Sequence, residues 1–367
     1  MNRLRQTASR LELIMTRRRW ILVIAIIVVG LLWRPVLRPA GQASIVIADI
    51  YSEQLVGTNV AQFVTPEPRV EETNDRFADV PMRVTYWRPG WGDRHPVVVV
   101  IPGAAVRGND EPLVRRFGLT LARAGYTVML PEFSFLKAGR FEPSATRQID
   151  AAFLRARQMP ETEGQNVGTF GVSVGGGMLL VAAAREPALR DASFIGILGG
   201  YYDIDTYLAS VASRSQRSGD RVVPWALSDE ALERIPPAAI DLVPPADRDA
   251  MRRALAAEKY DDALRQLRAL GPGARAALDG VSPEVGWSAI RPPIFWIHDP
   301  FDTYEPLAEA EAAQAAARDG HMVLVVPRLV QHAAPAGERV RTEGPLFVVG
   351  ELWRLLLFTF EVLQRAG

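Results

Sequence analysis

The chain has 367 residues, 48% of them hydrophobic, which suffices for one large domain or two small ones. Its 42 basic residues balance its 42 acidic residues, and a formal net charge of zero argues against nucleic acid as a partner. The chain has no cysteine, which excludes disulfides, thiolate metal sites and a cysteine nucleophile but leaves the compartment open.

The first feature in chain order is an uncharged apolar run, residues 20–33, which follows the arginine triplet Arg17 to Arg19. Extended to residue 37, the run nearly reaches the roughly 30 Å of a bilayer core. We interpret residues 1–19 as a basic cytoplasmic N-terminus and residues 20–37 as a single-pass transmembrane signal anchor, which places the remaining chain outside the cytoplasm. A cleaved signal peptide that releases a secreted protein is the first alternative, and a buried core helix is the second.

Residues 38–69 are predicted to form a tether, because proline and glycine punctuate them. Within this stretch, residues 44–56 have apolar side chains at helical spacing. Such a segment packs on the domain or lies on the membrane, and the spacing does not decide between the two.

A strand–helix alternation starts at residue 70 and runs to residue 367. The fully apolar stretch 97–101 is typical of a central parallel strand. This alternation predicts an α/β fold in which helices flank a mostly parallel sheet. Further strands are expected at 80–86, 126–130, 166–170, 194–198, 294–297 and 322–326, and helices at 112–123, 145–159, 178–184, 306–318 and 345–363.

Residues 203–288 interrupt this alternation. They show no strand pattern, but they contain four short helical stretches separated by Pro-Pro and Gly-Pro-Gly. We interpret them as a helical cap inserted into the domain. The helical stretches are 230–235, 247–257, 261–270 and 274–279.

The stretch Gly171-Val172-Ser173-Val174-Gly175-Gly176 lies between a predicted strand and a predicted helix. A turn this sharp forces the serine into a strained conformation, and the flanking positions need glycine. The Ser173 hydroxyl would then stand above the sheet, beside backbone N–H groups of a helix N-terminus that suit an anion. Ser173 is therefore the candidate nucleophile.

Four histidines are candidates for the base. In an open α/β sheet, chemistry takes place at the carboxyl ends of the strands. His95 precedes its strand and His321 starts one, whereas His298 and His332 follow strands. His332 is the better candidate, because it comes six residues after Val326 in a loop long enough to reach over the sheet. Four carboxylates follow strands between Ser173 and His332, and spacing alone does not separate them: Asp203, Asp205, Asp299 and Asp302.

Three motifs in this order resemble the α/β-hydrolase fold superfamily, in particular its dienelactone-hydrolase-like and peptidase-like esterase branch. Residues 171–176 resemble the nucleophile elbow, and His298-Asp299-Pro300-Phe301-Asp302-Thr303-Tyr304-Glu305-Pro306 resembles the family's H-G-x-x-D-x-x-V-P stretch. The loop with His332 matches the position of the base. The resemblance covers roughly residues 70–365, without most of the insertion.

The resemblance implies a serine, acid and base triad of Ser173, Asp302 and His332. It also implies an oxyanion hole made by the N–H groups of Val174 and Ala104. The sequence departs from the family in three places: Pro102-Gly103 replaces His-Gly, and Asp299 and Glu305 replace a glycine and a valine.

These observations predict a serine hydrolase that cleaves a small-molecule ester through an acyl-enzyme and requires no metal or organic cofactor. A serine peptidase is a narrower alternative. A hydrolase-fold protein that binds a ligand or partner without catalysis is an alternative of another class. The acyl group, the leaving group and the oligomeric state do not follow from the sequence.

Overall fold

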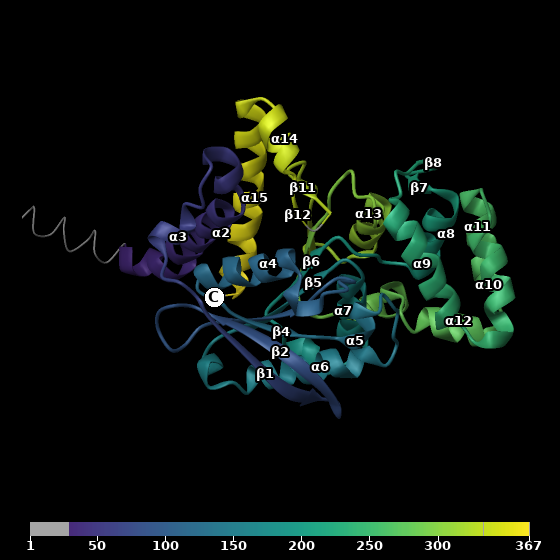
Figure 1. Ribbon diagram of the computed structural model, residues 1–367, viewed down its shortest axis with the longest axis horizontal. Coiled ribbons are helices and arrows are strands. Elements are labelled where there is room, and N and C mark those ends of the chain that lie inside the picture. The colour runs from purple at the N-terminus through teal and green to yellow at the C-terminus, as the bar shows by residue number, and fades with distance from the viewer. Residues whose placement is uncertain (1–28, 333, 367) are drawn as a thin grey trace, which may run out of the picture.

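The computed structural model describes residues 29–332 and 334–366. Their main feature is one eight-stranded sheet (Figure 1). In order across the sheet, the strands are β1 (Arg69–Phe77), β2 (Val80–Arg88), β4 (Thr127–Pro131), β3 (Val97–Ile101), β5 (Val167–Val172), β6 (Ile195–Leu198), β9 (Ile294–Ile297) and β10 (Met322–Val325). β2 pairs antiparallel with β1 and β4, and the other neighbouring strands are parallel. The predicted mostly parallel sheet is confirmed.

The fully buried strand β3 separates the two main apolar cores. Val97, Val99 and Ile101 belong to one core, whereas Val98 and Val100 belong to the other, because successive side chains of a strand point to opposite faces. The first core packs under α6 (Ala145–Arg157), α7 (Val174–Arg185) and α13 (Leu307–Ala316), and the second under α2 (Arg38–Val56), α4 (Pro112–Arg123) and α15 (Pro345–Ala366).

Shorter elements complete the connections between these helices and strands. They are α3 (Ala61–Val64), α5 (Ser134–Lys137), the hairpin of β11 (Val330–Gln331) and β12 (Ala334–Pro335), and α14 (Gly337–Thr342). The hairpin ends the loop after β10 and carries His332 at its turn.

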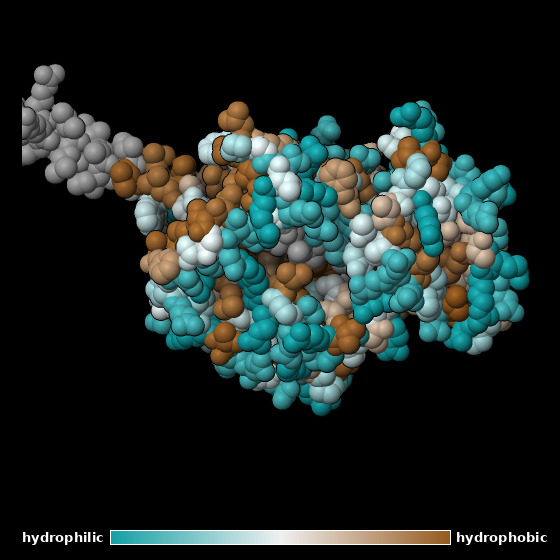
Figure 2. All heavy atoms as spheres, turned by 45° about the horizontal axis from the view of Figure 1, so that its top comes forward, coloured by the Kyte–Doolittle hydropathy of each residue, from teal (hydrophilic) through white to brown (hydrophobic). Residues whose placement is uncertain are grey.

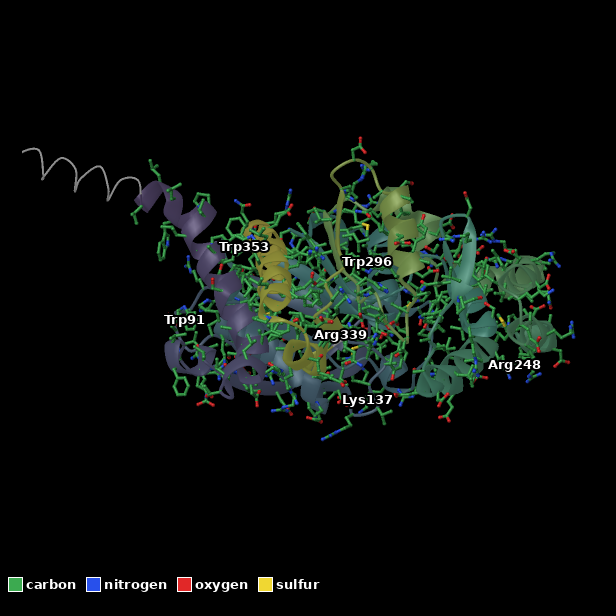
Figure 3. All side chains as sticks on the ribbon, turned by 90° about the horizontal axis from the view of Figure 1, so that it is seen from above. Trp91, Lys137, Arg248, Trp296, Arg339 and Trp353 are labelled. Carbon is green, nitrogen blue, oxygen red and sulfur yellow. The ribbon has the colours of Figure 1, made fainter. Side chains whose placement is uncertain are left out.

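The insertion at residues 203–288 is mainly helical, as predicted. Seen from above in Figure 3, Arg248 in the insertion and Trp353 on α15 lie towards opposite ends of the described chain. The insertion contains α8 (Ile204–Ser213), β7 (Ser215–Ser218), β8 (Arg221–Pro224), α9 (Asp229–Leu242), α10 (Arg248–Leu255), α11 (Tyr260–Arg268) and α12 (Pro272–Asp279).

Two expectations for the insertion were wrong. β7 and β8 form a hairpin around Gly219, which has a positive φ of 58°. The hairpin lacks apolar alternation, so its sequence carries little strand signal. Helix α9 also continues through Pro236 and Pro237, which were expected to end it. Ile235 and Ala239 beside them are buried, and this packing holds the helix where the prolines remove backbone hydrogen bonds.

The first part of the predicted tether is instead a packed helix. α2 lies against α15 and α4 (Figure 1). Its residues Ala43 and Tyr51 are buried. The buried side chain of Gln42 donates from Nε2 to the carbonyl oxygen of Ala124 over 2.8 Å and accepts from the Tyr126 hydroxyl over 3.2 Å. Of the two possibilities for residues 44–56, packing on the domain is the one observed.

Residues 1–28, which hold the predicted basic N-terminus and half of the predicted anchor, lie outside the described residues. The chain is helical from residue 29, and the first turns of this helix expose apolar side chains, among them Leu31, Trp33 and Leu37. Figure 2 shows apolar surface at this end of the described chain. Within residues 29–332 and 334–366, no helix combines the length and the apolar character that crossing a bilayer requires.

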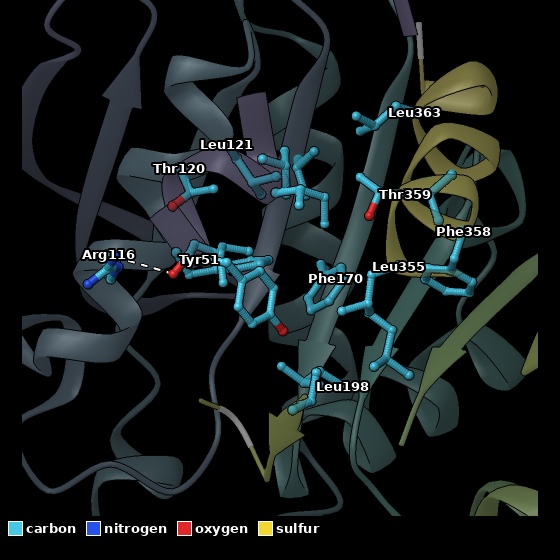
Figure 4. A pocket seen from close by; sticks show the side chains of 18 of the residues that line it. Tyr51, Arg116, Thr120, Leu121, Phe170, Leu198, Leu355, Phe358, Thr359 and Leu363 are labelled. Atoms are coloured by element: carbon cyan, nitrogen blue, oxygen red, sulfur yellow. Dashed lines mark hydrogen bonds between the residues drawn. The ribbon is translucent and has the colours of Figure 1, made fainter. Parts of the chain in front are cut away.

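An apolar cavity lies on the α2 side of the sheet, beneath α2, α4 and α15 (Figure 4). Its volume is about 160 Å³. The side chains of Val46, Phe117, Phe170, Leu198 and Phe358 are part of its lining. The cavity belongs to the second core and is distinct from the pocket that contains Ser173.

Replacing Gln42 with alanine tests whether α2 is part of the folded domain. The change leaves the buried carbonyl of Ala124 without its side-chain donor, so we expect the free energy of unfolding to fall by about 1–3 kcal/mol. Denaturant unfolding measures this value. Ser44→Ala is the control, because Ser44 is exposed and bonds only within its own helix. Equal stability of the two variants would indicate a detached helix.

Candidate active site

Ser173 occupies a strained turn between β5 and α7. Its φ is 52° and its ψ is −133°, a conformation that is rare for a residue with a side chain and that occurs mainly at functional sites. A Cβ on Gly171 would lie 2.6 Å from Cα of Gly176, and a Cβ on Gly175 would collide with the carbonyl oxygen of Pro102. Both glycines are therefore required for the turn to close and for the loop after β3 to approach it.

A pocket of about 430 Å³ opens above this turn. Its lining includes Ser173, Val174 and Ala104, together with Tyr304, Glu305 and His332. Helix α9 of the insertion contributes Glu230, Ala231, Arg234, Ile235 and Ala238 to the same pocket. The insertion thus borders the space next to the Ser173 hydroxyl.

The predicted acid and base are in direct contact. Oδ2 and Oδ1 of Asp302 lie 2.9 Å and 3.0 Å from Nδ1 of His332. In the neutral ring, the proton is therefore on Nδ1, and Nε2 is the nitrogen that can accept another proton. Asp302 is itself held by the backbone N–H groups of Tyr304 and Glu305, which donate to Oδ1 over 2.7 Å and 3.0 Å. Burial alone would raise the pKa of Asp302, but the hydrogen bond and charge of His332 lower it.

The structure separates the four aspartates that the sequence left equivalent. Asp299 accepts from the backbone N–H of His332 over 3.2 Å and pairs with Arg339 at 3.5 Å, so it supports the His332 loop and not the imidazole ring. Asp203 caps α8, and Asp205 pairs with Arg275 at 2.7 Å. Asp302 is the one of the four whose carboxylate contacts the imidazole.

The other histidines are engaged elsewhere. His298 is fully buried, and its Nε2 lies 3.0 Å from the carbonyl oxygen of Glu305, to which it donates. Burial lowers the pKa of His298, which keeps this ring neutral. Nε2 of His95 lies 2.6 Å from the carbonyl oxygen of Trp91, and His321 lies just before β10, at the opposite end of the sheet from Ser173.

Glu305 has a place in the site that its position in the sequence did not predict. The Ser173 hydroxyl donates to Oε1 of Glu305 over 2.6 Å, not to His332. Oε2 of the same carboxylate lies 3.2 Å from Nδ1 of His332. Glu305 is only 1% exposed, so this carboxylate sits inside the site. The sequence offers one signal for this position of Glu305: a glutamate stands where the stretch that residues 298–306 resemble has a valine.

The shared burial of these groups shifts their protonation. Burial raises the pKa of Glu305 to about 7, although the charge of His332 acts against this shift. Burial disfavours a charged His332, but the neighbouring carboxylates of Glu305 and Asp302 outweigh it and raise the pKa of the imidazole to about 9. Near neutral pH, the imidazole is therefore a cation between two carboxyl groups.

Asp302, Glu305 and His332 each bring one atom of a type that binds metals within 4.8 Å of the others. Hydrogen bonds join Ser173 to Glu305 and Asp302 to His332, and a charge pair at 3.2 Å joins Glu305 to His332.

The residues predicted to form the oxyanion hole also border the pocket. Val174 is the first residue of α7, where backbone N–H groups have no partner within the helix. Ala104 follows Gly103, and a Cβ on Gly103 would lie 3.1 Å from the Ser173 Cβ. Both residues line the pocket with Ser173, on the side where the dipole of α7 favours negative charge.

Together, the strand order, the parallel strands from β4 to β10 and the serine on the turn after β5 define an α/β-hydrolase fold. The sequence matches no protein-family model and no curated protein.

Among solved structures, the fold is similar to that of Pyrococcus horikoshii acylaminoacyl peptidase and to that of brefeldin A esterase, described as a bacterial homologue of human hormone sensitive lipase. The uncomplexed peptidase has a TM-score of 0.51 and 13% identity over 82% of this chain and 43% of its own. The esterase has a TM-score of 0.51 and 17% identity over 89% of this chain and 85% of its own. The chain thus spans less than half of the peptidase. At these identities, the likeness establishes the fold.

Asp302→Asn and Asp299→Asn form a matched pair of substitutions that tests the assignment of the acid. Asp302→Asn removes the charge that orients the imidazole and is expected to lower turnover of an activated ester by up to about ten-thousandfold. Asp299→Asn keeps an oxygen for the His332 N–H and is expected to cost far less. Steady-state kinetics of the two purified variants measure the difference, and a larger loss for Asp299→Asn would contradict the assignment.

Proposed function

We propose that this chain is a serine hydrolase that cleaves a small-molecule ester through an acyl-enzyme. The observation that carries the proposal is the position of Ser173. It is strained at the turn between β5 and α7 and faces a pocket that also holds the bonded pair His332 and Asp302. A strained nucleophile beside an oriented imidazole is the arrangement that acyl transfer requires.

In the proposed reaction, the Ser173 oxygen attacks the acyl carbonyl carbon and its proton passes to the acid–base groups beside it. From the sequence, the group that takes this proton is expected to be His332, whose ring Asp302 orients. The N–H groups of Val174 and Ala104 stabilise the negative oxygen that forms. The leaving alcohol receives a proton, and water then hydrolyses the acyl-enzyme. Helix α9 borders the pocket and is positioned to contact the acyl group.

Two alternatives are separated by simple assays. A serine peptidase would turn over acylated peptides faster than the matching esters. A hydrolase-fold binding protein would bind ligands in the pocket but would not react with a fluorophosphonate. The presence of the bonded pair Asp302 and His332 beside a strained serine favours an enzyme over a binding protein.

Fluorophosphonate labelling of the intact chain tests the nucleophile. We expect one covalent adduct on Ser173, and we expect Ser173→Ala to lose the adduct and at least about a thousandfold in ester turnover while it keeps its circular dichroism spectrum. Ser134→Ala, at an exposed serine, is the control and should label as the wild type does. Substantial turnover by Ser173→Ala would refute the proposed function.

We also propose that residues 20–37 anchor the protein as a single-pass segment, with residues 1–19 in the cytoplasm and the hydrolase domain outside. Two observations support this: the arginine triplet before the apolar run, and the exposed apolar side chains at residues 31–33 where the described helix begins.

Extraction and intact mass test the anchor. An anchored protein keeps residues 1–43 and requires detergent, whereas a cleaved one starts near Ser44 and is released by osmotic shock. A further test fuses after Gly367 a reporter that works only in the cytoplasm. Activity of this reporter would contradict both the anchored and the cleaved form, because each places the domain outside.

A further inference from the structure

A buried carboxylate connects the proposed nucleophile with the imidazole. Oε1 of Glu305 accepts from the Ser173 hydroxyl over 2.6 Å, and Oε2 lies 3.2 Å from Nδ1 of His332. The Glu305 backbone is held at both ends, since its N–H donates to Asp302 and its carbonyl accepts from His298. The Glu305 side chain is therefore placed against Ser173 by its surroundings.

The burial of Glu305 is costly and has no evident structural benefit. A carboxylate loses its hydration when it is buried, and an apolar side chain at position 305 would fill the space without that cost. Oε2 of Glu305 has no hydrogen-bond partner among the described residues, and it forms a charge pair with the His332 ring at 3.2 Å. The neighbours that could stabilise the carboxylate are thus the reacting groups themselves.

The charges around His332 favour a different division of roles between the two groups. Because Asp302 and Glu305 both face Nδ1, the imidazole retains its proton to a pKa of about 9, whereas Glu305 loses its proton at a pKa of about 7. A group that is ionised and a neighbour that is still protonated form a base and an acid at the same pH. The other titratable or charged groups facing this pair are His298, Asp299 with Arg339, Tyr201, Tyr207 and Tyr304.

We propose that Glu305 is a catalytic residue that accepts the Ser173 proton during acylation, while the charged His332 donates a proton to the leaving alcohol. This inference rests on the proposed function and deepens it, because it assigns the base and the acid of the first step to two different side chains.

The proton transfers balance over one cycle. In acylation, the Oγ–H bond of Ser173 breaks, its proton moves to Oε1 of Glu305, and Oγ bonds to the acyl carbon. The bond from that carbon to the alcohol oxygen then breaks, and this oxygen takes a proton from Nε2 of His332. In deacylation, neutral His332 takes a proton from water, whose oxygen bonds to the acyl carbon. Oγ leaves and recovers its proton from Glu305, which restores the starting state.

Glu305→Gln tests this role by the pH dependence of kcat/KM for an activated ester. The wild type should show a bell that rises as Glu305 ionises and falls as His332 loses its proton, with apparent values that belong to the coupled pair. The glutamine keeps the volume and an acceptor for the Ser173 hydroxyl but cannot take its proton. We expect kcat to fall by at least about a hundredfold, and the remaining activity to rise with pH as neutral His332 takes over as base.

Glu309→Gln is the matched control. Glu309 is also fully buried, and burial raises its pKa to about 7 as well, but it accepts from the Tyr202 and Asp203 backbone and from Thr206, away from Ser173. This variant should keep the wild-type pH profile. If Glu305→Gln is instead as active as the wild type at neutral pH, with its rising limb moved to lower pH, then His332 is the base and the inference is wrong.

A measurement on the wild type alone covers the case in which Glu305→Gln does not fold. The rate of fluorophosphonate labelling of Ser173 should rise with pH around a midpoint near the Glu305 pKa of about 7. A midpoint near the His332 pKa of about 9 would overturn the role of Glu305 and leave the proposed function intact. Absence of labelling at every pH would instead refute the proposed function.

Discussion

The attraction of two buried carboxylates for the half-buried imidazole between them, at the carboxyl end of the sheet, is the interaction on which the rest of the site depends. Asp302 and Glu305 are each at most 3% exposed, and two such like charges repel strongly in a low-dielectric interior. The positive charge of His332 between them reduces this repulsion. In return, the two carboxylates raise the pKa of the ring, while burial raises the pKa of Glu305. The protonation of each member therefore depends on the other two.

The segment after β9 builds this cluster largely from local contacts. The carboxylate of Asp302 accepts two backbone N–H groups of its own turn, and His298 fixes the far end of that turn through the Glu305 carbonyl. The insertion holds the same turn from outside. Trp225 donates to the carbonyl of Asp302 over 2.7 Å, and the Tyr304 hydroxyl donates to Glu230 of α9 over 2.6 Å. The insertion thus both lines the pocket and fixes the backbone that carries Asp302.

Much of the fold was readable because its signals are local. The apolar run 97–101 became β3 with the same bounds, and the glycines around Ser173 predicted a strand, a sharp turn and a helix where β5 and α7 meet. These patterns report steric and burial requirements of a few neighbouring residues. The failures have physical causes too, one local and one tertiary. The β7–β8 hairpin lacks apolar alternation, and α9 persists through two prolines because tertiary packing offsets the lost hydrogen bonds.

By itself, the sequence determined the class of fold, the strained position of Ser173 and the order of the candidate acid and base, since residue type and spacing along the chain carry that information. Only the tertiary structure decided which of the four aspartates meets His332, that α2 packs on α15, and that the Ser173 hydroxyl donates to Glu305. Ser173 and Glu305 are 132 positions apart, and no rule of local spacing brings such residues within hydrogen-bonding distance. Their contact follows from the packing of parallel strands, which gathers the ends of distant segments at one edge of the sheet.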